Sequence, residues 1–334
     1  MPVLDPNYPT MENVAKRLDP DGSVAHIVEV LNKTNDILLD MPWFEGNLVT
    51  GHRTTIRNGI PLPTWRRAYQ GVMPSKSTTT QVDENCGNLE ALSEIDTLIA
   101  DLGGNAVAYR KTEDMAIVEG INQTVARTIF YGNEGAEPAQ FTGLAPRFNT
   151  RNAAVAPSAD NVIHGGGASS DNTSVWLVVW GQQSVHGIFP KGSKLGLSME
   201  DMGQQLIQKS DGSKYKAYVS RFQWQCGLSV RDWRYVVRVA NISVGALTKD
   251  AASGADLVDL LTQATHRVPS LRAGRPAFYA NREVMSYLDR QMKNHKNINL
   301  TRADLGGEPT LMLGQVPIRR CDELLNTETV VPNS

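Results

Sequence analysis

The stretch that most restricts how this chain can fold is residues 48–82. It is rich in Thr, Gly and Arg, and an Asn58-Gly59 turn signal is followed by Ile-Pro-Leu-Pro. This pattern predicts strands near 48–57 and 64–72, joined as a long hairpin. Neither strand has a consistent apolar face, and an isolated two-stranded ribbon is only marginally stable in water. The hairpin therefore needs a surface outside itself to lie on.

The charge of this stretch is opposite to that of the segment after it. No acidic residue occurs from Gly46 to Val82, where the basic residues are Arg53, Arg57, Arg66, Arg67 and Lys76. From Asp83 to Glu119 the acids are Asp83, Glu84, Glu90, Glu94, Asp96, Asp101, Glu113, Asp114 and Glu119, opposed only by Arg110 and Lys111. A basic ribbon beside an acidic stretch is what complementary contacts between identical subunits require, but two separately solvated faces explain the charges equally well.

Composition limits the class of protein. The 334 residues are 41% hydrophobic and 20% charged, which suffices to bury a core. A formal net charge of −2 argues against a dedicated DNA-coating protein, which would be basic. Cys86, Cys226 and Cys321 form neither a disulfide framework nor a zinc-ligand spacing. Without a basic and apolar leader or a run of ~18 apolar residues, the sequence predicts neither export nor a membrane span.

Residues 105–131 predict one long helix. Apolar residues recur there at steps of three and four, no proline interrupts them, and Gly132 ends the pattern. The residues of this apolar face are Met115, Val118, Ile121, Val125 and Ile129. At ~1.5 Å per residue the helix would span about 40 Å, which is long for an ordinary domain and indicates a spine.

Strands are expected in three further places. Residues 133–215 predict a loop-rich region with one apolar strand at Val175–Trp180. Residues 215–242 alternate in the manner of β-strands, and a last β segment is expected from Thr310 to Ile318.

Two shorter helices are expected between the last of these strands. The first covers 256–267, with Ser253 and Asp256 as a capping box, and the second covers 282–293, with Asn281 as N-cap. Strands on both sides of helices predict an α+β protein.

Motifs of the kind that carry chemistry are incomplete in this sequence. His164-Gly165-Gly166-Gly167 has the form of the oxyanion-hole loop of lipases, but no G-x-S-x-G nucleophile elbow occurs in the chain. The segment Gly187–Lys194 departs from a phosphate-binding loop because Ser precedes Lys. The histidines are scattered, without metal-ligand spacing. We therefore expect no catalytic residues, no cofactor and no metal site, and a structural role.

Several blocks of the sequence resemble the major capsid proteins of short-tailed double-stranded DNA bacteriophages. They run in order through the chain: Thr128-Ile-Phe-Tyr-Gly-Asn with Pro138-Ala-Gln-Phe-Thr-Gly-Leu-Ala-Pro-Arg-Phe, Ser174-Val-Trp-Leu-Val-Val-Trp-Gly, Gly187-Ile-Phe-Pro-Lys-Gly-Ser, Gly227-Leu-Ser-Val-Arg-Asp-Trp-Arg-Tyr-Val-Val-Arg-Val-Ala-Asn-Ile and Thr310-Leu-Met-Leu-Gly-Gln-Val-Pro-Ile. Each block alone is weak, but together they cover about residues 105 to 320 and are specific.

This resemblance implies the Hong Kong 97-type capsid fold. In that fold an N-terminal arm precedes an extended hairpin called the E-loop, a peripheral domain with a spine helix, and an axial domain. The implied divisions are an arm at 1–47, the E-loop at 48–85, a peripheral domain at 86–150 with its spine helix at 105–131, a shared β-rich segment at 151–245, an axial domain at 246–309 and a return strand at 310–334.

The resemblance also implies a function. Copies of the chain would assemble into hexamers and pentamers of an icosahedral shell that encloses double-stranded DNA without reading its sequence. The expected partners are other copies, a separate scaffolding protein (because no scaffolding domain precedes the arm), the portal protein and a decoration or cement protein, with no membrane. Assembly is expected in the cytoplasm of the bacterial host, and the mature location is the virion capsid.

Contacts between subunits are then expected at the charged and aromatic residues of the hairpin and of the acidic stretch. These are Arg53, Arg57, Trp65, Arg66, Arg67, Glu90, Glu94 and Asp96.

Two alternatives remain open at this point. One is another structural protein of the virion, such as a tail or decoration protein. The other is a hydrolase that uses the glycine loop at His164.

Overall fold

The computed structural model describes residues 33–102, 105–209, 211–249, 254–294, 300–305 and 308–333. The expected arm is therefore described only from Lys33 onward, and Ser253 of the expected capping box lies outside the described residues. The helices are α2 (Ile37–Asp40), α3 (Thr97–Leu102), α4 (Ala106–Tyr131), α5 (Leu257–Arg267) and α6 (Arg282–Asn294), with short 3-10 turns at Ala145–Phe148, Pro157–Asn161, Trp233–Tyr235 and Leu271–Ala273. The strands are β1 (Trp43–Glu45), β2 (Gly51–Gly59), β3 (Thr78–Asp96), β4 (Val162–His164), β5 (Asn172–Trp180), β6 (Val185–Phe189), β7 (Ser198–Gln208), β8 (Lys214–Val230), β9 (Val236–Ser243), β10 (Arg275–Ala280), β11 (Leu300–Leu305), β12 (Glu308–Leu313) and β13 (Val316–Arg320).

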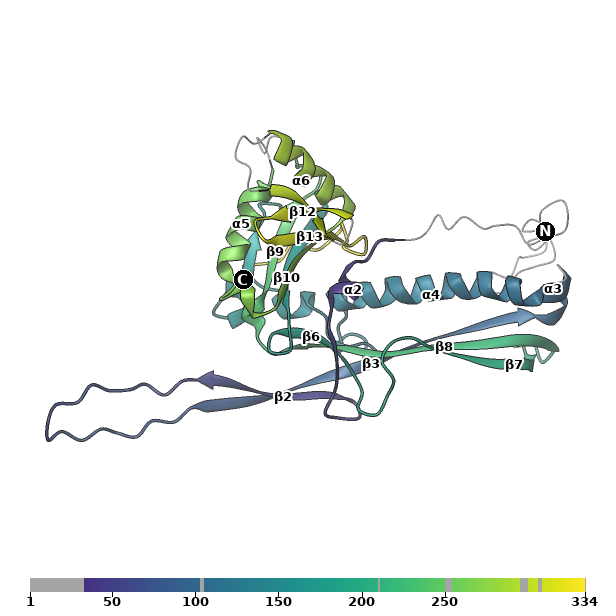
Figure 1. The fold of residues 1–334 in the computed structure, drawn as a ribbon, viewed down its shortest axis with the longest axis horizontal. Helices are drawn as coiled ribbons and strands as arrows, with labels where there is room; N and C mark the ends of the chain where they lie inside the picture. The colour runs from purple at the N-terminus through teal and green to yellow at the C-terminus, as the bar shows by residue number, and fades with distance from the viewer. Residues whose placement is uncertain are drawn as a thin grey trace. The chain divides into compact units, whose positions relative to one another are not determined.

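The chain forms two compact units (Figure 1). The described part of the first unit contains Asn88–Val125 and Gly196–Gln225, and the second contains Thr34–Gly87, Ala126–Leu195 and the chain from Cys226 onward. Three elements, β3, α4 and β8, contribute residues to both units.

The core of the second unit is built around β5. All nine residues of this strand are buried, and the strand pairs antiparallel with β10 on one side and with β9 on the other. Leu177, for example, lies opposite Phe278 of β10 and opposite Val237 of β9. A strand covered on both faces is expected to read as a continuous apolar run, and Val175–Trp180 does so.

Helices α5 and α6 pack on this sheet through apolar residues that include Leu257, Leu261, Val284 and Leu288. The predicted N-cap Asn281 is confirmed, whereas the predicted capping box is wrong for Asp256, which is itself the N-cap of α5. The Asp256 side chain accepts a hydrogen bond from the Asp259 N–H (3.2 Å), and Asn281 Oδ1 accepts one from the Val284 N–H (2.9 Å). Such caps satisfy backbone donors that the first turn of a helix leaves open.

The first unit has a small core of its own. Ile95, Ile99, Ala100 and Tyr109 are buried together, with Tyr218 packed against them. Strands β7 and β8 form an antiparallel pair from Ser198↔Gln223 to Gln208↔Lys214. The expectation of a loop-rich region with a single strand at 133–215 is therefore wrong, because β4, β6 and β7 lie there in addition to β5.

Helix α4 confirms the predicted spine almost to the residue, and its apolar face is confirmed in part. Ile121, Val125 and Ile129 are buried, but Met115 is 63% exposed and Val118 is 39% exposed. The first half of the predicted face is therefore not covered within the described part of the subunit.

The predicted hairpin exists, but its second strand is placed differently. Strand β2 pairs with β3 from Gly51↔Asn85 to Gly59↔Thr78, so the expected strand at 64–72 is wrong. Residues 60–77 form no strand, and they include prolines at 61, 63 and 74, which lack the N–H that a ladder requires. The Asn58-Gly59 pair is not a tight turn; the ladder shifts register between Arg57 and Gly59.

The closing β segment is also divided. Strands β12 and β13 replace the single segment expected at 310–318, and they turn at Gly314, whose φ of 59° suits a residue without a side chain. Mixed strands and helices in the two units confirm the α+β class.

Candidate interaction surface

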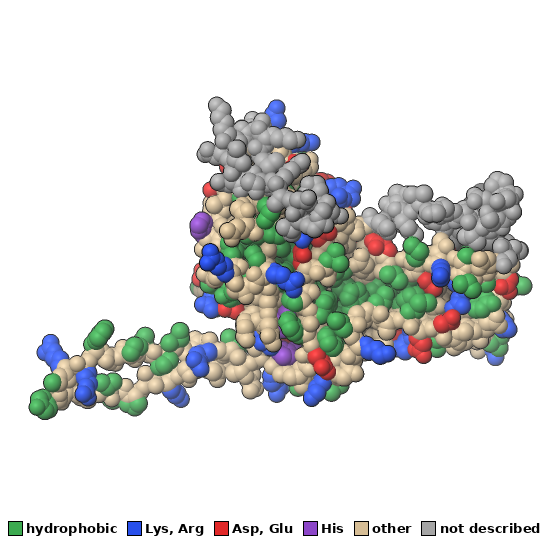
Figure 2. All heavy atoms as spheres, viewed as in Figure 1, with side chains coloured by type: hydrophobic (Ala, Val, Ile, Leu, Met, Phe, Trp, Pro, Cys, Tyr) green, Lys and Arg blue, Asp and Glu red, His purple; other side chains and the backbone are tan. Residues whose placement is uncertain are grey.

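The outer part of the hairpin, residues 60–77, is called the hairpin tip below. Its large apolar side chains are exposed, Val72 by 51% and the others almost completely, and these others are Ile60, Leu62, Trp65, Tyr69 and Met73. Figure 2 shows hydrophobic and basic side chains along the hairpin, with no layer of the protein over them. So many large exposed apolar side chains on one segment are unusual on a protein that stays monomeric, and they mark a surface that another molecule covers.

The basic side chains of the hairpin divide into two kinds. Arg57, Arg66 and Arg67 are exposed, and among the described residues no carboxylate pairs with them. Arg53 lies opposite Asp83 in the ladder and binds its carboxylate with two bonds, Nε to Oδ1 at 2.6 Å and Nη2 to Oδ2 at 2.7 Å. The hydrogen bond and charge of Arg53 lower the pKa of Asp83. Arg53 is thus already neutralised within its own chain, which the sequence interpretation did not predict.

The expected acids have partners as well. Glu90 accepts hydrogen bonds from Arg221 Nε (2.6 Å) and Nη2 (3.0 Å), and this contact lowers its pKa. Glu94 accepts a long bond from the Tyr215 hydroxyl (3.4 Å), and Asp96 accepts one from the Leu98 N–H (2.9 Å). The charge pattern along the sequence could not predict these partners. Glu90 and Arg221, for example, come together only because β3 and β8 are adjacent in the sheet.

The place where the hairpin joins its unit, residues 46–53 with 83–87, is called the hairpin root below. Unlike the tip, it has buried residues, Gly51, His52 and Glu84. The Glu84 carboxylate accepts a hydrogen bond from Arg147 Nη1 (2.8 Å) and another from Nη2, and the Cys86 N–H donates to the Thr50 carbonyl (2.9 Å). The root is therefore fixed to the loop after α4, while the tip is not held.

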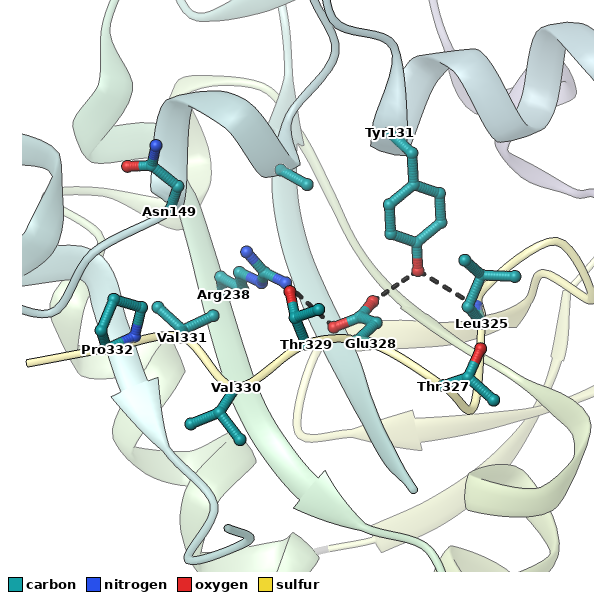
Figure 3. A pocket seen from close by; sticks show the side chains of 11 residues that line it. Tyr131, Asn149, Arg238, Leu325, Thr327, Glu328, Thr329, Val330, Val331 and Pro332 are labelled. Atoms are coloured by element: carbon teal, nitrogen blue, oxygen red, sulfur yellow. Dashed lines mark hydrogen bonds and ion pairs between the residues drawn. The ribbon is translucent and has the colours of Figure 1, made fainter. Parts of the chain in front are cut away.

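A second polar cluster holds the tail, residues 321–333, in the core of the same unit (Figure 3). The Glu328 carboxylate accepts hydrogen bonds from the Tyr131 and Ser174 hydroxyls and pairs with Arg238 Nη2 at 2.9 Å. Both charged side chains are 5% exposed, and Arg238 lies over the Trp176 ring at 5.0 Å. Burial and the adjacent Glu328 carboxylate raise the pKa of Tyr131 well above its usual value.

The same tail borders a cavity of about 350 Å³ that Tyr131, Asn149, Arg238 and Thr329 help to line (Figure 3). Further along, Asn241 Oδ1 accepts a hydrogen bond from the Val331 N–H (2.8 Å), and the Arg151 N–H donates to the Pro332 carbonyl (2.9 Å). The sequence interpretation missed this cluster, because Tyr131, Arg238 and Glu328 are distant in the chain and share no motif.

The glycine loop after His164 has a packing role in this structure. The Gly165 N–H donates to the Ala240 carbonyl and the Gly167 N–H to the Asn241 carbonyl, both at 2.7 Å. A side chain at Gly167 would collide with the Asn241 carbonyl, and one at Gly165 would collide with the Ile242 side chain. The amides that an oxyanion hole would use are therefore already bonded within the fold.

In the part of the chain that the structure describes, no group of three His, Cys, Asp or Glu side chains is placed to hold a metal ion. No described helix is both long and apolar enough to cross a lipid bilayer.

Comparison with known proteins decides the family. A family model described as major capsid protein GP7 matches residues 19–332. The chain belongs to this family of major capsid proteins. A search of curated proteins found no match.

Solved structures agree with this assignment. The capsid protein resembles a chain in the structure of bacteriophage epsilon15 with a TM-score of 0.79 and 36% sequence identity, over 100% of both chains. It also resembles the capsid chain of bacteriophage JBD30 with a TM-score of 0.50 and 9% identity, over 89% of this chain and 94% of that one. The second match shows the fold alone. The Hong Kong 97-type fold and the assignment to the virion capsid, both expected from sequence resemblance, are confirmed, and a shell protein is favoured over a tail or decoration protein.

Proposed function

We propose that the hairpin is the main connector between copies of this capsid protein in an icosahedral shell of hexamers and pentamers. The observation that carries this proposal is the hairpin tip. Its apolar side chains are exposed and its Arg57, Arg66 and Arg67 are without carboxylate partners among the described residues, so the tip has nothing to stabilise it inside its own subunit.

The neighbouring copy would supply both missing components. Apolar side chains of the tip, Trp65 first among them, would lose contact with water at about 25 cal/mol per Å² of buried apolar surface. The arginines would face acids of the adjacent subunit, and Glu94 and Asp96 are better candidates than Glu90, which already binds Arg221. Each exposed pair contributes only ~0–1 kcal/mol, but the contact repeats at every subunit of the lattice.

The other functional assignments follow from the same fold. We assign 1–47 to an arm, 48–85 to the E-loop, 86–150 to a peripheral domain, 151–245 to a shared β-rich segment, 246–309 to an axial domain and 310–334 to a return strand. A separate scaffolding protein, the portal protein and a decoration protein would bind the assembled copies, and packaged DNA would be enclosed without sequence recognition. We assign no catalytic role, because the glycine loop at His164 is bonded into the sheet.

Charge reversal in the tip tests the connector role. Arg66→Glu combined with Arg67→Glu should leave the subunit folded but prevent assembly at low salt, because repulsion then repeats at every contact. Circular dichroism would report folding, and light scattering with electron microscopy would report shells. Combined Glu94→Lys and Asp96→Lys substitutions should restore assembly.

The matched control is Lys191→Glu with Lys194→Glu. These two lysines are exposed, lie in the same unit outside the hairpin, and undergo the same change of charge. The control should assemble normally. Normal shells from the hairpin variant, or equal failure of the control, would contradict the proposed role of the tip.

A further inference from the structure

The hairpin root contains a histidine whose ring has an unusual environment. His52 is 9% exposed, and each ring nitrogen faces an N–H donor. Nε2 lies 2.7 Å from Arg231 Nη2, and Nδ1 lies 3.3 Å from the Asn47 backbone nitrogen, whose N–H points at it. An arginine has donors only, so the ring must accept at Nε2. The neutral ring does this with its proton on Nδ1, so the Asn47 N–H is in contact with the ring and makes no hydrogen bond to it.

A doubly protonated ring does not fit this environment. Protonation would replace the acceptor lone pair of Nε2 with an N–H group that faces the Arg231 N–H, and the ring would bear a positive charge 2.7 Å from the Arg231 guanidinium. The short contact with Arg231 would change from a hydrogen bond into a repulsion.

The residues around His52 provide no free countercharge. On β3, the residue opposite is Glu84, whose carboxylate is bound by Arg147. Next to Glu84 on β3, Asp83 is bound by Arg53, and on β1 Glu45 accepts from the Gly192 N–H (2.8 Å). On β6, the neighbour is His186, whose ring centroid lies 6.1 Å away. Among the described residues no carboxylate pairs with Arg231, and its buried Nε has no partner.

His52 also contacts the part of the root that orients the hairpin. The Asn47 backbone N–H contacts the His52 ring, and the Asn47 side chain binds the backbone of Arg53, the residue that follows His52. Its Oδ1 accepts from the Arg53 N–H (2.7 Å), and its Nδ2 donates to the Arg53 carbonyl (2.8 Å). A displaced His52 ring therefore disturbs the contact that fixes where β2 leaves the unit.

We propose that the hairpin root is an acid-sensitive joint, in which protonation of His52 breaks its contact with Arg231 and frees the hairpin to change direction. At neutral pH the joint is closed and presents the tip in one orientation. In mild acid it opens, while the ladder between β2 and β3 farther out remains paired.

The sign of the pH dependence follows from the site. Burial, and next the charge of Arg231, lower the pKa of His52 below its usual value of 6.5. The folded state therefore favours the neutral ring, so its stabilising effect is complete above pH 6.5 and is lost as the pH falls from 6.5 through the lowered value. His186 is shifted further, since burial together with Arg231 and His52 lowers its pKa to about 4, and it stays neutral through most of this range.

Hydrogen exchange of the full-length unassembled chain tests the joint. The reporters are the Arg53 and Cys86 amides, both bonded within the root. After correction for the intrinsic pH dependence of exchange, we expect opening at these amides to increase from neutral pH to mild acid. The increase should be about tenfold for each unit by which folding lowers the pKa of His52. Amides of β5 should show no such increase.

Three variants distinguish this joint from general acid unfolding. His52→Gln keeps an acceptor for Arg231 but does not titrate, so its root should open equally at neutral and acid pH. Arg231→Gln removes the facing charge and should reduce the acid response. His164→Gln is the matched control, because the pKa of His164 is also lowered, chiefly by burial, and it lies on β4 away from the root; it should keep the wild-type response.

Two results would overturn the proposal. One is an acid response of the root that is unchanged in His52→Gln. The other is wild-type protein whose root amides show the same corrected exchange at neutral pH and in mild acid. This second result would decide the question even if His52→Gln failed to fold.

Discussion

Strand β5 and the hairpin tip belong to the same unit, but β5 is buried and the tip is exposed to solvent. Every residue of β5 is buried between β9 and β10, with Trp176 and Trp180 almost inaccessible. The tip exposes Trp65 and Tyr69 completely. Both regions are rich in large apolar residues, so hydrophobicity alone does not separate them. Their difference teaches that β5 obtains its stability within the subunit, whereas the tip has to obtain it from another molecule.

The largest expected effect is in the core cluster at the tail. Glu328→Gln keeps the size of the side chain but leaves Arg238 buried without a countercharge, so we expect the free energy of unfolding to fall by ~3–5 kcal/mol. Urea denaturation followed by tryptophan fluorescence would measure it. The control is Asp83→Asn, which removes the exposed partner of Arg53 and should cause no measurable change. Equal effects of the two substitutions would break the comparison between core and hairpin.

Truncation of matched leucines sharpens the same comparison. Leu177 on β5 is buried, and Leu62 at the tip is 82% exposed. Leu177→Ala should lower the free energy of unfolding by about 2–5 kcal/mol, because it leaves a cavity in a packed core. Leu62→Ala should change it by less than about 0.5 kcal/mol. A large loss of subunit stability in Leu62→Ala would show that the tip packs on its own unit.

The smallest effect on the subunit, with a clear effect on assembly, is expected for Trp65→Ala. The ring is fully exposed, so the free energy of unfolding should not change. If the ring is a buried anchor between copies, its loss should raise the concentration needed for assembly by roughly tenfold for each 1.4 kcal/mol of lost contact energy. Leu39→Ala is the control, since Leu39 is an exposed apolar residue outside the hairpin. Unchanged assembly of Trp65→Ala, measured by light scattering against protein concentration, would count against the connector role.

The features that could be predicted are those written in neighbouring residues. The spacing of Ile121, Val125 and Ile129 predicted α4 nearly to its ends, and the N-cap Asn281 was identified correctly. The apolar run at Val175–Trp180 predicted the central strand. Helix periodicity, capping and a doubly covered strand all depend on residues close in the chain, so one sequence suffices to recognise them.

The parts that only the tertiary structure decided depend on segments far apart in the chain. The pairing of β2 with residues from Thr78 onward, the ion pair of Glu90 with Arg221, and the burial of Glu328 against Tyr131 and Arg238 have no local signal. Met115 and Val118 continue the apolar pattern of α4 and yet are exposed, because periodicity defines a face of a helix but not what covers it. Which charges meet and which apolar residues are covered is set by how strands are placed beside one another, and that placement is a property of the whole fold.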